Sequence, residues 1–272
     1  MIKVFVNEKQ YEFSEGVTLD DIKQKFKPTA DLVILNGFPI SVDNLSQKVL
    51  EGDRIVLIKK GEIPSEDELE TLMVARHTPG VHKKIKNSSV GIAGLGGLGS
   101  NVAIALARVG IGKLVLVDFD VVEPSNLNRQ HYFLRHIGLF KTEVMKQMIY
   151  EINPYVNVVV HTIKVDETNI AELFSDIDIL VEAFDTDIAK RMLIENFQKI
   201  YPKKSIISAS GVAGYYSSNT IRVRKITPYF YVVGDEEHSA MQGVGLMSPR
   251  VGIVAHMQAN MVLRVIMSED KP

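Results

Sequence analysis

Residues 90–100 read VGIAGLGGLGS, a glycine-rich turn between a predicted strand and a predicted helix. An apolar strand predicted over Val90–Ala93 leads into it, and a helix predicted over Ser100–Val109 leaves it. Four glycines lie between them, at Gly94, Gly96, Gly97 and Gly99. Such a turn has no side chains to keep phosphates away, and the helix N-terminus offers free N–H donors. The stretch predicts a nucleotide site. A tight turn without ligand is the alternative, and the glycines alone do not separate NAD from ATP.

Strands and helices alternate after this turn. Strands are predicted at Lys113–Val117, Val156–Val160, Asp178–Val181 and Ser205–Ala209, and helices at Lys141–Ile152, 168–174 and 187–200. This order predicts an α/β protein with a doubly wound, mainly parallel, Rossmann-like sheet. Beyond Ser210, Thr220–Arg224 and Tyr229–Val233 are predicted to be antiparallel strands, and Pro249 begins a last helix that ends near Met267.

The first sixty residues predict a second, smaller unit. A hairpin is predicted from Ile2–Val6 and Tyr11–Phe13, followed by a helix over Leu19–Phe26 that Thr18 can cap. Two more strands are predicted at Leu32–Leu35 and Arg54–Lys60. The segment around Pro39 is predicted to be a loop. This order fits a β-grasp domain over residues 1–60, followed by a linker and helix start over 61–75 and the nucleotide-binding domain over 76–272.

Composition narrows the chemistry. The 272 residues carry a formal net charge of -2, which gives no indication of a nucleic-acid or membrane partner. Met1 leads straight into charged sequence, and no apolar run reaches the roughly 18 residues of a membrane span, so a cytoplasmic location is expected. The chain has no cysteine. Cys-based zinc sites, thioesters and persulfides on this protein are therefore excluded.

Two acids follow the next predicted strand. Asp118 directly succeeds the apolar run that ends at Val117, about 20 residues after the glycine turn, where an acid can accept hydrogen bonds from ribose hydroxyls. Asp120 is either a second contact or a turn or cap residue.

Cations near the glycine turn favour ATP over NAD. Arg129 lies in the segment NLNRQ, which begins at Asn126, and Lys141 ends the segment GLFK. A hydride-transfer enzyme has no need of these cations, whereas a nucleotidyl transfer uses them to neutralise leaving pyrophosphate. By itself, Lys141 would be read as a solvated helix start.

An acid beyond a later strand suggests a metal. Asp185 follows the strand predicted to end at Val181, and a carboxylate at this edge can hold Mg²⁺ directly or through water. The alternative is that Asp185 or Asp187 caps a helix. Arg76 stands alone in the sequence, and its spacing offers nothing against a surface role.

These motifs together resemble the ThiF/MoeB/ubiquitin-activating superfamily over residues 68–267. The order is the glycine turn, DFD at 118–120, NLNRQ at 126–130, GLFK at 138–141 and Asp185. The ending GLMSPRVGIVAHMQANMVLRVI at 245–266 resembles the shorter, second-family ThiF proteins of thiamine biosynthesis. In residues 1–60, LNGFPI and EGDRIVLI resemble strands of ThiS, a β-grasp sulfur carrier.

The resemblance implies ATP and Mg²⁺ as cofactors and assigns roles along the chain. It makes Gly97 a nucleotide contact, Asp118 the ribose acid, Asn126 and Arg129 ATP contacts, Lys141 the phosphate lysine, and Asp185 the Mg²⁺-linked acid. Arg76 resembles an arginine that family members insert into the neighbouring subunit's ATP site, which implies a homodimer.

Two departures from the family pattern are evident. A ThiS protein ends in a free Gly-Gly carboxylate, but this chain continues through Lys60-Gly61-Glu62, so its β-grasp domain has no carboxylate to adenylylate. We expect a degenerate fused copy that serves docking or regulation. The zinc-binding cysteines of many relatives are missing as well, and no zinc is expected.

The sequence thus predicts an enzyme that adenylylates the C-terminal glycine of a separate ThiS-like sulfur carrier in thiazole synthesis, with sulfur from a separate donor. Rival readings are an NAD-dependent oxidoreductase, a non-catalytic carrier-binding module, and an adenylyltransferase for a molybdopterin carrier, a peptide or a tRNA base. Residues 234–249 are either a lid that clamps the carrier or an ordinary loop. The seven histidines show no metal-ligand spacing and are interpreted as core or surface residues.

Overall fold

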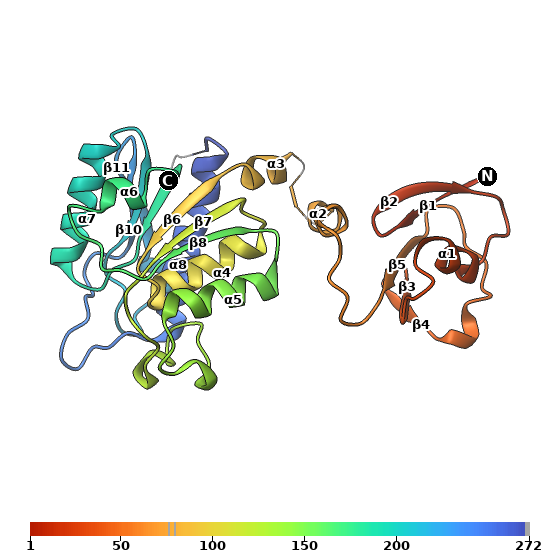
Figure 1. Cartoon of the computed structure of the whole chain (residues 1–272), viewed down its shortest axis with the longest axis horizontal. Coiled ribbons are helices and arrows are strands. Elements are labelled where there is room, and N and C mark those ends of the chain that lie inside the picture. Colours follow the sequence, from red (N-terminus) through yellow and green to blue (C-terminus); the bar gives the residue numbers. More distant parts are fainter. Residues whose placement is uncertain (76, 79, 270–272) are drawn as a thin grey trace. The chain divides into compact units, whose positions relative to one another are not determined.

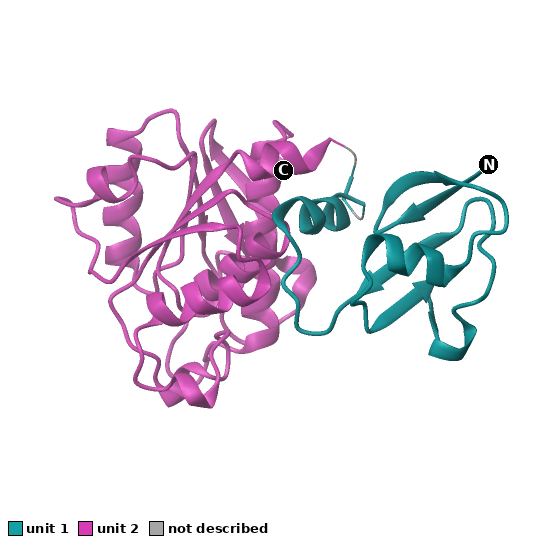
Figure 2. Cartoon of the chain, turned by 45° about the vertical axis from the view of Figure 1, so that its right-hand side comes forward, with its two compact units in different colours: residues 1–79 teal, residues 80–272 magenta. Residues whose placement is uncertain are grey.

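The computed structural model describes residues 1–75, 77–78 and 80–269 and divides the chain into two compact units, Met1–Pro79 and Gly80–Pro272 (Figure 2). In the first unit, β1 (Ile2–Val6), β2 (Lys9–Phe13), α1 (Leu19–Phe26), β3 (Leu32–Leu35), β4 (Phe38–Ile40) and β5 (Arg54–Ile58) precede α2 (Glu66–Val74). The strand order is β2-β1-β5-β3-β4, with β1 and β5 parallel. This arrangement confirms the predicted β-grasp fold.

Local chemistry explains the helix and the missed strand of this unit. The Thr18 side chain accepts from the Asp21 N–H, and the Asp21 side chain accepts from the Thr18 N–H, which is the predicted capping box. Leu19 and Ile22 then bury against the strands. The prediction of a loop around Pro39 was wrong, because Pro39 lies in β4. That strand pairs only with β3, and an edge strand tolerates a residue that cannot donate to the ladder.

The second unit is a doubly wound sheet. Its elements are α3 (Val81–Lys86), β6 (Ser89–Ala93), α4 (Gly97–Arg108), β7 (Lys113–Val117), α5 (Lys141–Ile152), β8 (Asn157–His161), α6 (Ile170–Leu173), β9 (Ile179–Glu182), α7 (Asp187–Ile200), β10 (Ser205–Ala209), β11 (Arg222–Thr227), β12 (Phe230–Gly234) and α8 (Ser248–Ile266). The strand order is β11-β12-β10-β9-β6-β7-β8, parallel except for β11. The predicted fold class is therefore confirmed.

Alternation along the buried strands fills both faces of this sheet. On β7, Leu114 and Leu116 join the core beneath α4, α5 and α8, whereas Val115 and Val117 join the core beneath α6 and α7 (Figure 1). Chain order reverses between β6 and β9, and the crevice at the carboxyl ends of such strands is where open α/β sheets bind ligands.

Several element boundaries differ from the prediction by one to three residues, and two of them have a clear local reason. Helix α4 begins at Gly97 rather than Ser100, since glycine has a low helix propensity and hides the first turn from a pattern-based reading. Strand β11 begins at Arg222 rather than Thr220, because Ser218–Thr220 forms a 3₁₀ turn. Among the described residues, no helix combines the length and the apolar character that a membrane crossing requires.

Candidate active site

The glycine turn after β6 is built so tightly that larger residues do not fit. Gly94 has φ 92° and its N–H donates to the Val117 carbonyl, 2.8 Å away. A Cβ on Gly99 would lie 1.8 Å from the Gly94 carbonyl oxygen. Gly94 and Gly99 are buried, whereas Gly96 and Gly97 are partly exposed at the start of α4. The exposed pair therefore offers the unpaired N–H groups of a helix N-terminus to an anion.

Arg129 lies against this turn. A Cβ on Gly97 would lie 3.3 Å from the Arg129 Cγ and 3.0 Å from the Val251 Cγ1, so glycine at 97 leaves room for the arginine. Asn101 Nδ2 donates to the carbonyls of Gly97 and Arg129, at 2.6 and 3.3 Å, and so ties the backbone of Arg129 to the first turn of α4. No sequence motif indicated this role for Asn101.

Two buried polar atoms beside the turn have no hydrogen-bond partner among the described residues. They are Arg129 Nε and Gln130 Oε1. The Gln130 amide also lies 3.7 Å from where a Cβ on Gly96 would be. Because buried polar groups are normally paired, an unpaired donor and acceptor beside a phosphate-sized turn fit a polar ligand. Gln130 was not predicted as a site residue, although it closes the NLNRQ segment.

Asp118 joins the end of β7 to the glycine turn. Its carboxylate accepts from the Leu95 N–H at 2.6 Å and from the Asp120 N–H at 2.8 Å. Burial raises the pKa of Asp118, although these hydrogen bonds and Lys141 lower it in part. The Tyr132 hydroxyl donates to the Leu95 carbonyl at 2.9 Å, and burial raises the pKa of Tyr132 well above its usual 10.0. Each oxygen of the Asp118 carboxylate keeps a further lone pair that can accept from a ribose hydroxyl.

Lys141 is buried and paired, which excludes the alternative that it is a solvated helix start. Its Nζ lies 2.9 Å from Asp120 Oδ2, and its own N–H donates to the Asp120 carbonyl. Asp120 is therefore the partner of a buried cation as well as a turn residue. The Asn126 side chain is also buried, and its Oδ1 accepts from the Glu123 N–H at 3.1 Å within the 3₁₀ turn Pro124–Asn126.

The exit of β9 passes over the glycine turn. A Cβ on Gly94 would lie 2.8 Å from the Ala183 carbonyl oxygen, so Asp185, two residues further on, lies at the same sheet edge and is exposed. The reading of Asp185 or Asp187 as a cap was wrong, because Thr186 caps α7 by accepting from the Ala189 N–H.

Glu182 fixes this exit, a role that the sequence did not reveal. The buried carboxylate accepts from the Phe184 N–H at 2.7 Å and from Lys190 Nζ at 3.1 Å on both oxygens. The Ser208 hydroxyl donates to it as well. These bonds set the direction of the chain just before Asp185.

Metal ligands in this part of the molecule are few. Among the described residues, no group of three or more His, Cys, Asp or Glu side chains could hold a metal ion. Magnesium binds through one or two carboxylates plus substrate phosphates and water. Asp185 fits that mode, in which most ligands come from the nucleotide. The predicted site residue Arg76 lies outside the described residues.

Residues 234–249 are fastened to the rest of the unit at several points. The carbonyls of His238 and Gly245 accept from the N–H groups of Ala213 and Gly214, both at 2.9 Å. The Leu246 carbonyl accepts from Asn128 Nδ2 at 3.0 Å. The loop therefore reaches the residue next to Arg129, and its role as a clamp on a carrier stays a prediction.

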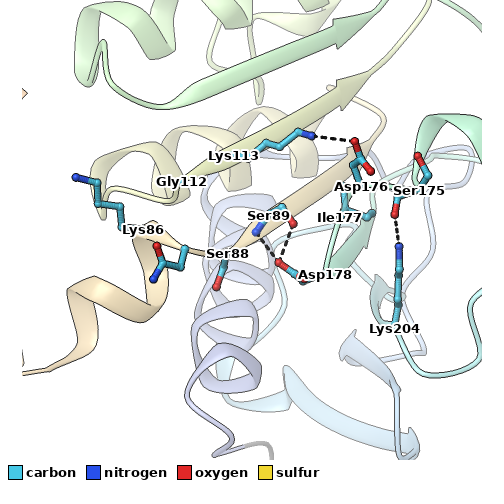
Figure 3. A pocket seen from close by; sticks show the side chains of 11 residues that line it. Lys86, Ser88, Ser89, Gly112, Lys113, Ser175, Asp176, Ile177, Asp178 and Lys204 are labelled. Atoms are coloured by element: carbon cyan, nitrogen blue, oxygen red, sulfur yellow. Dashed lines mark hydrogen bonds and ion pairs between the residues drawn. The ribbon is translucent and has the colours of Figure 1, made fainter.

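A separate pocket of about 630 Å³ lies at the other end of the strands, away from the glycine turn (Figure 3). It opens where the strands begin, and its polar groups pair with one another. Lys113 lies 3.6 Å from Asp176, Ser89 donates to Asp178, and Lys204 donates to the Ser175 carbonyl. These internal pairs leave the glycine turn as the better nucleotide site.

The sheet order, the glycine turn and the fused β-grasp unit define a Rossmann-like nucleotide-binding protein with a ubiquitin-like domain. The chain belongs to the ThiF family, whose profile matches residues 70–272, and residues 2–61 match the ThiS-like ubiquitin profile.

Individual relatives agree with this assignment. The chain is 30% identical over 203 residues to the "Adenylyltransferase and sulfurtransferase UBA4" of Candida glabrata and 31% identical over 202 residues to that of Vanderwaltozyma polyspora. The matches cover 72% and 71% of this chain but 46% of each relative, so the chain spans about half the length of these relatives.

Solved structures share the fold. The Escherichia coli tRNA N6-threonylcarbamoyladenosine dehydratase TcdA, in complex with ATP, superposes with a TM-score of 0.68 at 24% identity, covering 76% of this chain and 98% of TcdA. E. coli MccB with ATP gives a TM-score of 0.54 at 25% identity, covering 71% and 59%.

Proposed function

We propose that this protein uses ATP to adenylylate the C-terminal glycine carboxylate of a separate ThiS-like sulfur carrier, in thiazole synthesis for thiamine. The observation that carries the proposal is the arrangement of Arg129, Lys141 and Asp118 around a glycine turn with unpaired polar atoms. Support comes from the UBA4 relatives, named adenylyltransferases, and from TcdA and MccB, solved with ATP. The ThiS-like domain of this chain also favours a carrier of that type.

The reaction needs positioning and charge neutralisation more than covalent help. A carboxylate oxygen of the carrier attacks the α-phosphorus of ATP in line. The bond from the α-phosphorus to the bridging oxygen breaks, and pyrophosphate leaves. Gly96, Gly97 and the start of α4 hold phosphates, and Asp118 accepts from the ribose.

Arg129 and Lys141 stabilise the charge that develops on pyrophosphate. Arg129 has an unpaired Nε beside the turn, and Lys141 can exchange its Asp120 partner for a phosphate oxygen. Asn126 contributes a further ATP contact. Bound magnesium supplies additional neutralisation, and Asp185 is the side chain that would hold it.

We further propose that the protein acts as a homodimer. Between β7 and α5, seven large apolar side chains are exposed: Phe119, Val121, Phe133, Leu134, Ile137, Leu139 and Phe140. Exposed apolar clusters of this kind mark interaction surfaces. The segment adjoins the Asn126–Gln130 motif, so a second copy seated here would lie beside this site. That the second copy's Arg76 enters the site is implied only by the family resemblance. Sedimentation at micromolar concentration should show a dimer, and Leu134→Asp should give a monomer.

ATP–pyrophosphate exchange tests the proposed reaction. The full chain is mixed with ATP, Mg²⁺ and a separately made ThiS-like carrier that ends in Gly-Gly, and label transfer from pyrophosphate into ATP is measured. The control carrier lacks the last glycine. Exchange with the first carrier and background exchange with the second support the proposal. Exchange only with a molybdopterin carrier or a peptide would reassign the substrate, and tight NADH binding without ATP binding would overturn the proposal.

A further inference from the structure

A buried ion pair holds a histidine in the loop after β12. Asp235 and the Arg250 guanidinium form an ion pair in which both side chains are almost completely buried. Arg250 also donates to the carbonyls of Tyr216 and Ser217, at 2.9 and 3.0 Å. The second partner of the Asp235 carboxylate is His238, whose Nδ1 lies 2.6 Å from Oδ2.

This geometry fixes the tautomer of His238. Burial by itself raises the pKa of Asp235, but the N–H groups of His238 and Glu237, the His238 ring and Arg250 together lower it to about 2. Asp235 is thus a carboxylate that only accepts, so Nδ1 carries a proton, and in the neutral tautomer with that proton Nε2 is an acceptor. The ring also stacks on Tyr216, with centroids 3.7 Å apart, and 28% of the His238 side chain stays exposed.

The histidine lies at the sheet edge that carries the nucleotide motifs. Strands β12 and β10 run parallel to β9 and β6, so the segments that follow them share the edge of the glycine turn. The His238 carbonyl accepts from Ala213, just beyond β10, and the same loop reaches Asn128 through Leu246. In Figure 1 the loop after β12, in blue, and the loops between β7 and α5, in green, extend on the same side of the sheet.

We propose that His238, oriented by Asp235, is the general base for the step that consumes the acyl-adenylate. This inference rests on the proposed function. None of the 272 residues is a cysteine, so none of them can take the acyl group as a thioester, and the proposal takes the thiol of a separate sulfur donor as the attacking nucleophile. A thiol is a weak nucleophile until it loses its proton, and a histidine at a fixed orientation is suited to accept it.

The thiol attack forms one bond, breaks one bond and moves one proton. The thiol sulfur forms a bond to the glycine carbonyl carbon, the bond from that carbon to the AMP oxygen breaks, and AMP leaves with the bonding pair. The thiol proton passes to His238 Nε2. The resulting imidazolium is stabilised by the Asp235 carboxylate, and Arg250 keeps that carboxylate in place.

Single-turnover kinetics test this role. Acyl-adenylate is formed on wild type and on His238→Gln with a Gly-Gly carrier, and AMP release is timed after dithiothreitol is added as the thiol. Hydroxylamine, a strong nucleophile that is mostly unprotonated at neutral pH, is used in a parallel series. His256→Gln is the matched control, since His256 is an exposed histidine on α8 whose Nδ1 donates to the Gly252 carbonyl.

We expect His238→Gln to keep wild-type pyrophosphate exchange, to slow AMP release by the thiol about 10²–10³-fold, and to leave hydroxylamine release nearly unchanged. Equal thiol rates in the two proteins, or equal losses with both nucleophiles, would overturn the role as a base. Absence of exchange in the wild type would instead refute the proposed function and this inference with it.

Discussion

The segment after β5 and the turn after β6 differ in whether nearby polar groups have hydrogen-bond partners. After β5, the Lys60 N–H donates to Asp31 at 2.9 Å, and Lys27 lies 2.9 Å from Glu62 and 3.7 Å from Glu68. The hydrogen bond that Lys27 donates to the Glu62 carboxylate raises the pKa of Lys27. Beside the turn that follows β6, by contrast, Arg129 Nε and Gln130 Oε1 are buried without a hydrogen-bond partner among the described residues.

The difference distinguishes a segment whose polar groups are paired within the chain from a site whose polar groups are left for a ligand. In a ThiS-type carrier the chain would end near Gly61 in a free carboxylate, but here it turns back and is held by side chains of its own unit. The glycine turn keeps donors and acceptors for another molecule. The comparison therefore supports nucleotide chemistry in the second unit, whereas a docking or regulatory role of the first unit stays a prediction.

The largest expected effect is a loss of stability confined to one unit. Ile22 is fully buried in the β-grasp core, and Ile22→Ala should destabilise that unit by about 2–5 kcal/mol. Hydrogen exchange should show faster exchange in residues 1–60 only, with pyrophosphate exchange unchanged. Ile92→Ala is the matched control beneath the glycine turn, and it should lower both the stability of the second unit and the exchange rate. If Ile22→Ala abolished exchange as well, the assignment of chemistry to the second unit would be wrong.

Next in size is the loss of a cation at the turn. Arg129→Ala should lower pyrophosphate exchange about 10²–10³-fold, equivalent to about 2.7–4 kcal/mol of transition-state stabilisation. Steady-state kinetics with ATP and carrier measure it, and Arg108→Ala, an exposed arginine at the end of α4, serves as the control. A loss of similar size in Arg108→Ala would mean that general charge, and not the position of Arg129, matters.

A smaller effect is expected from closing the space inside the turn. Gly99→Ala puts a Cβ 1.8 Å from the Gly94 carbonyl, and such overpacking costs about 1–3 kcal/mol. Both thermal stability and ATP affinity should fall. Gly252→Ala, in open space on α8, should be neutral or raise stability by up to about 1 kcal/mol. Unchanged ATP affinity in Gly99→Ala would show that the turn does not bind the nucleotide.

The smallest effect is a pH dependence of stability. The pKa of Asp235 in the folded protein is about 2, below its usual 3.8, so the carboxylate stabilises the fold fully above pH 3.8 and this contribution disappears as pH falls through 2. The contribution is about 2 kcal/mol. Urea unfolding of wild type and Asp235→Asn between pH 5 and pH 2 should show the two stabilities converging by that amount. Parallel curves would contradict the depressed pKa.

Sequence reasoning found the strands and the charged motifs because each depends on local pattern. Apolar runs predict the buried strands, and Arg129 and Lys141 lie in motifs of fixed spacing. It missed β4, because proline argues against a strand unless its edge position is known. It also missed Asn101, Glu182 and Gln130, since an amide or a buried carboxylate gains its role from partners far away in the chain.

The order of elements, the glycine turn and the missing cysteine were determined by the sequence alone, because periodicity, backbone freedom and composition are properties of the chain itself. The burial of Lys141 against Asp120, the unpaired atoms beside Gly96 and Gly97, and the pairing of His238 with Asp235 and Arg250 were decided only by the tertiary structure. Each of these depends on which groups packing removes from water, and packing brings together residues from separate elements.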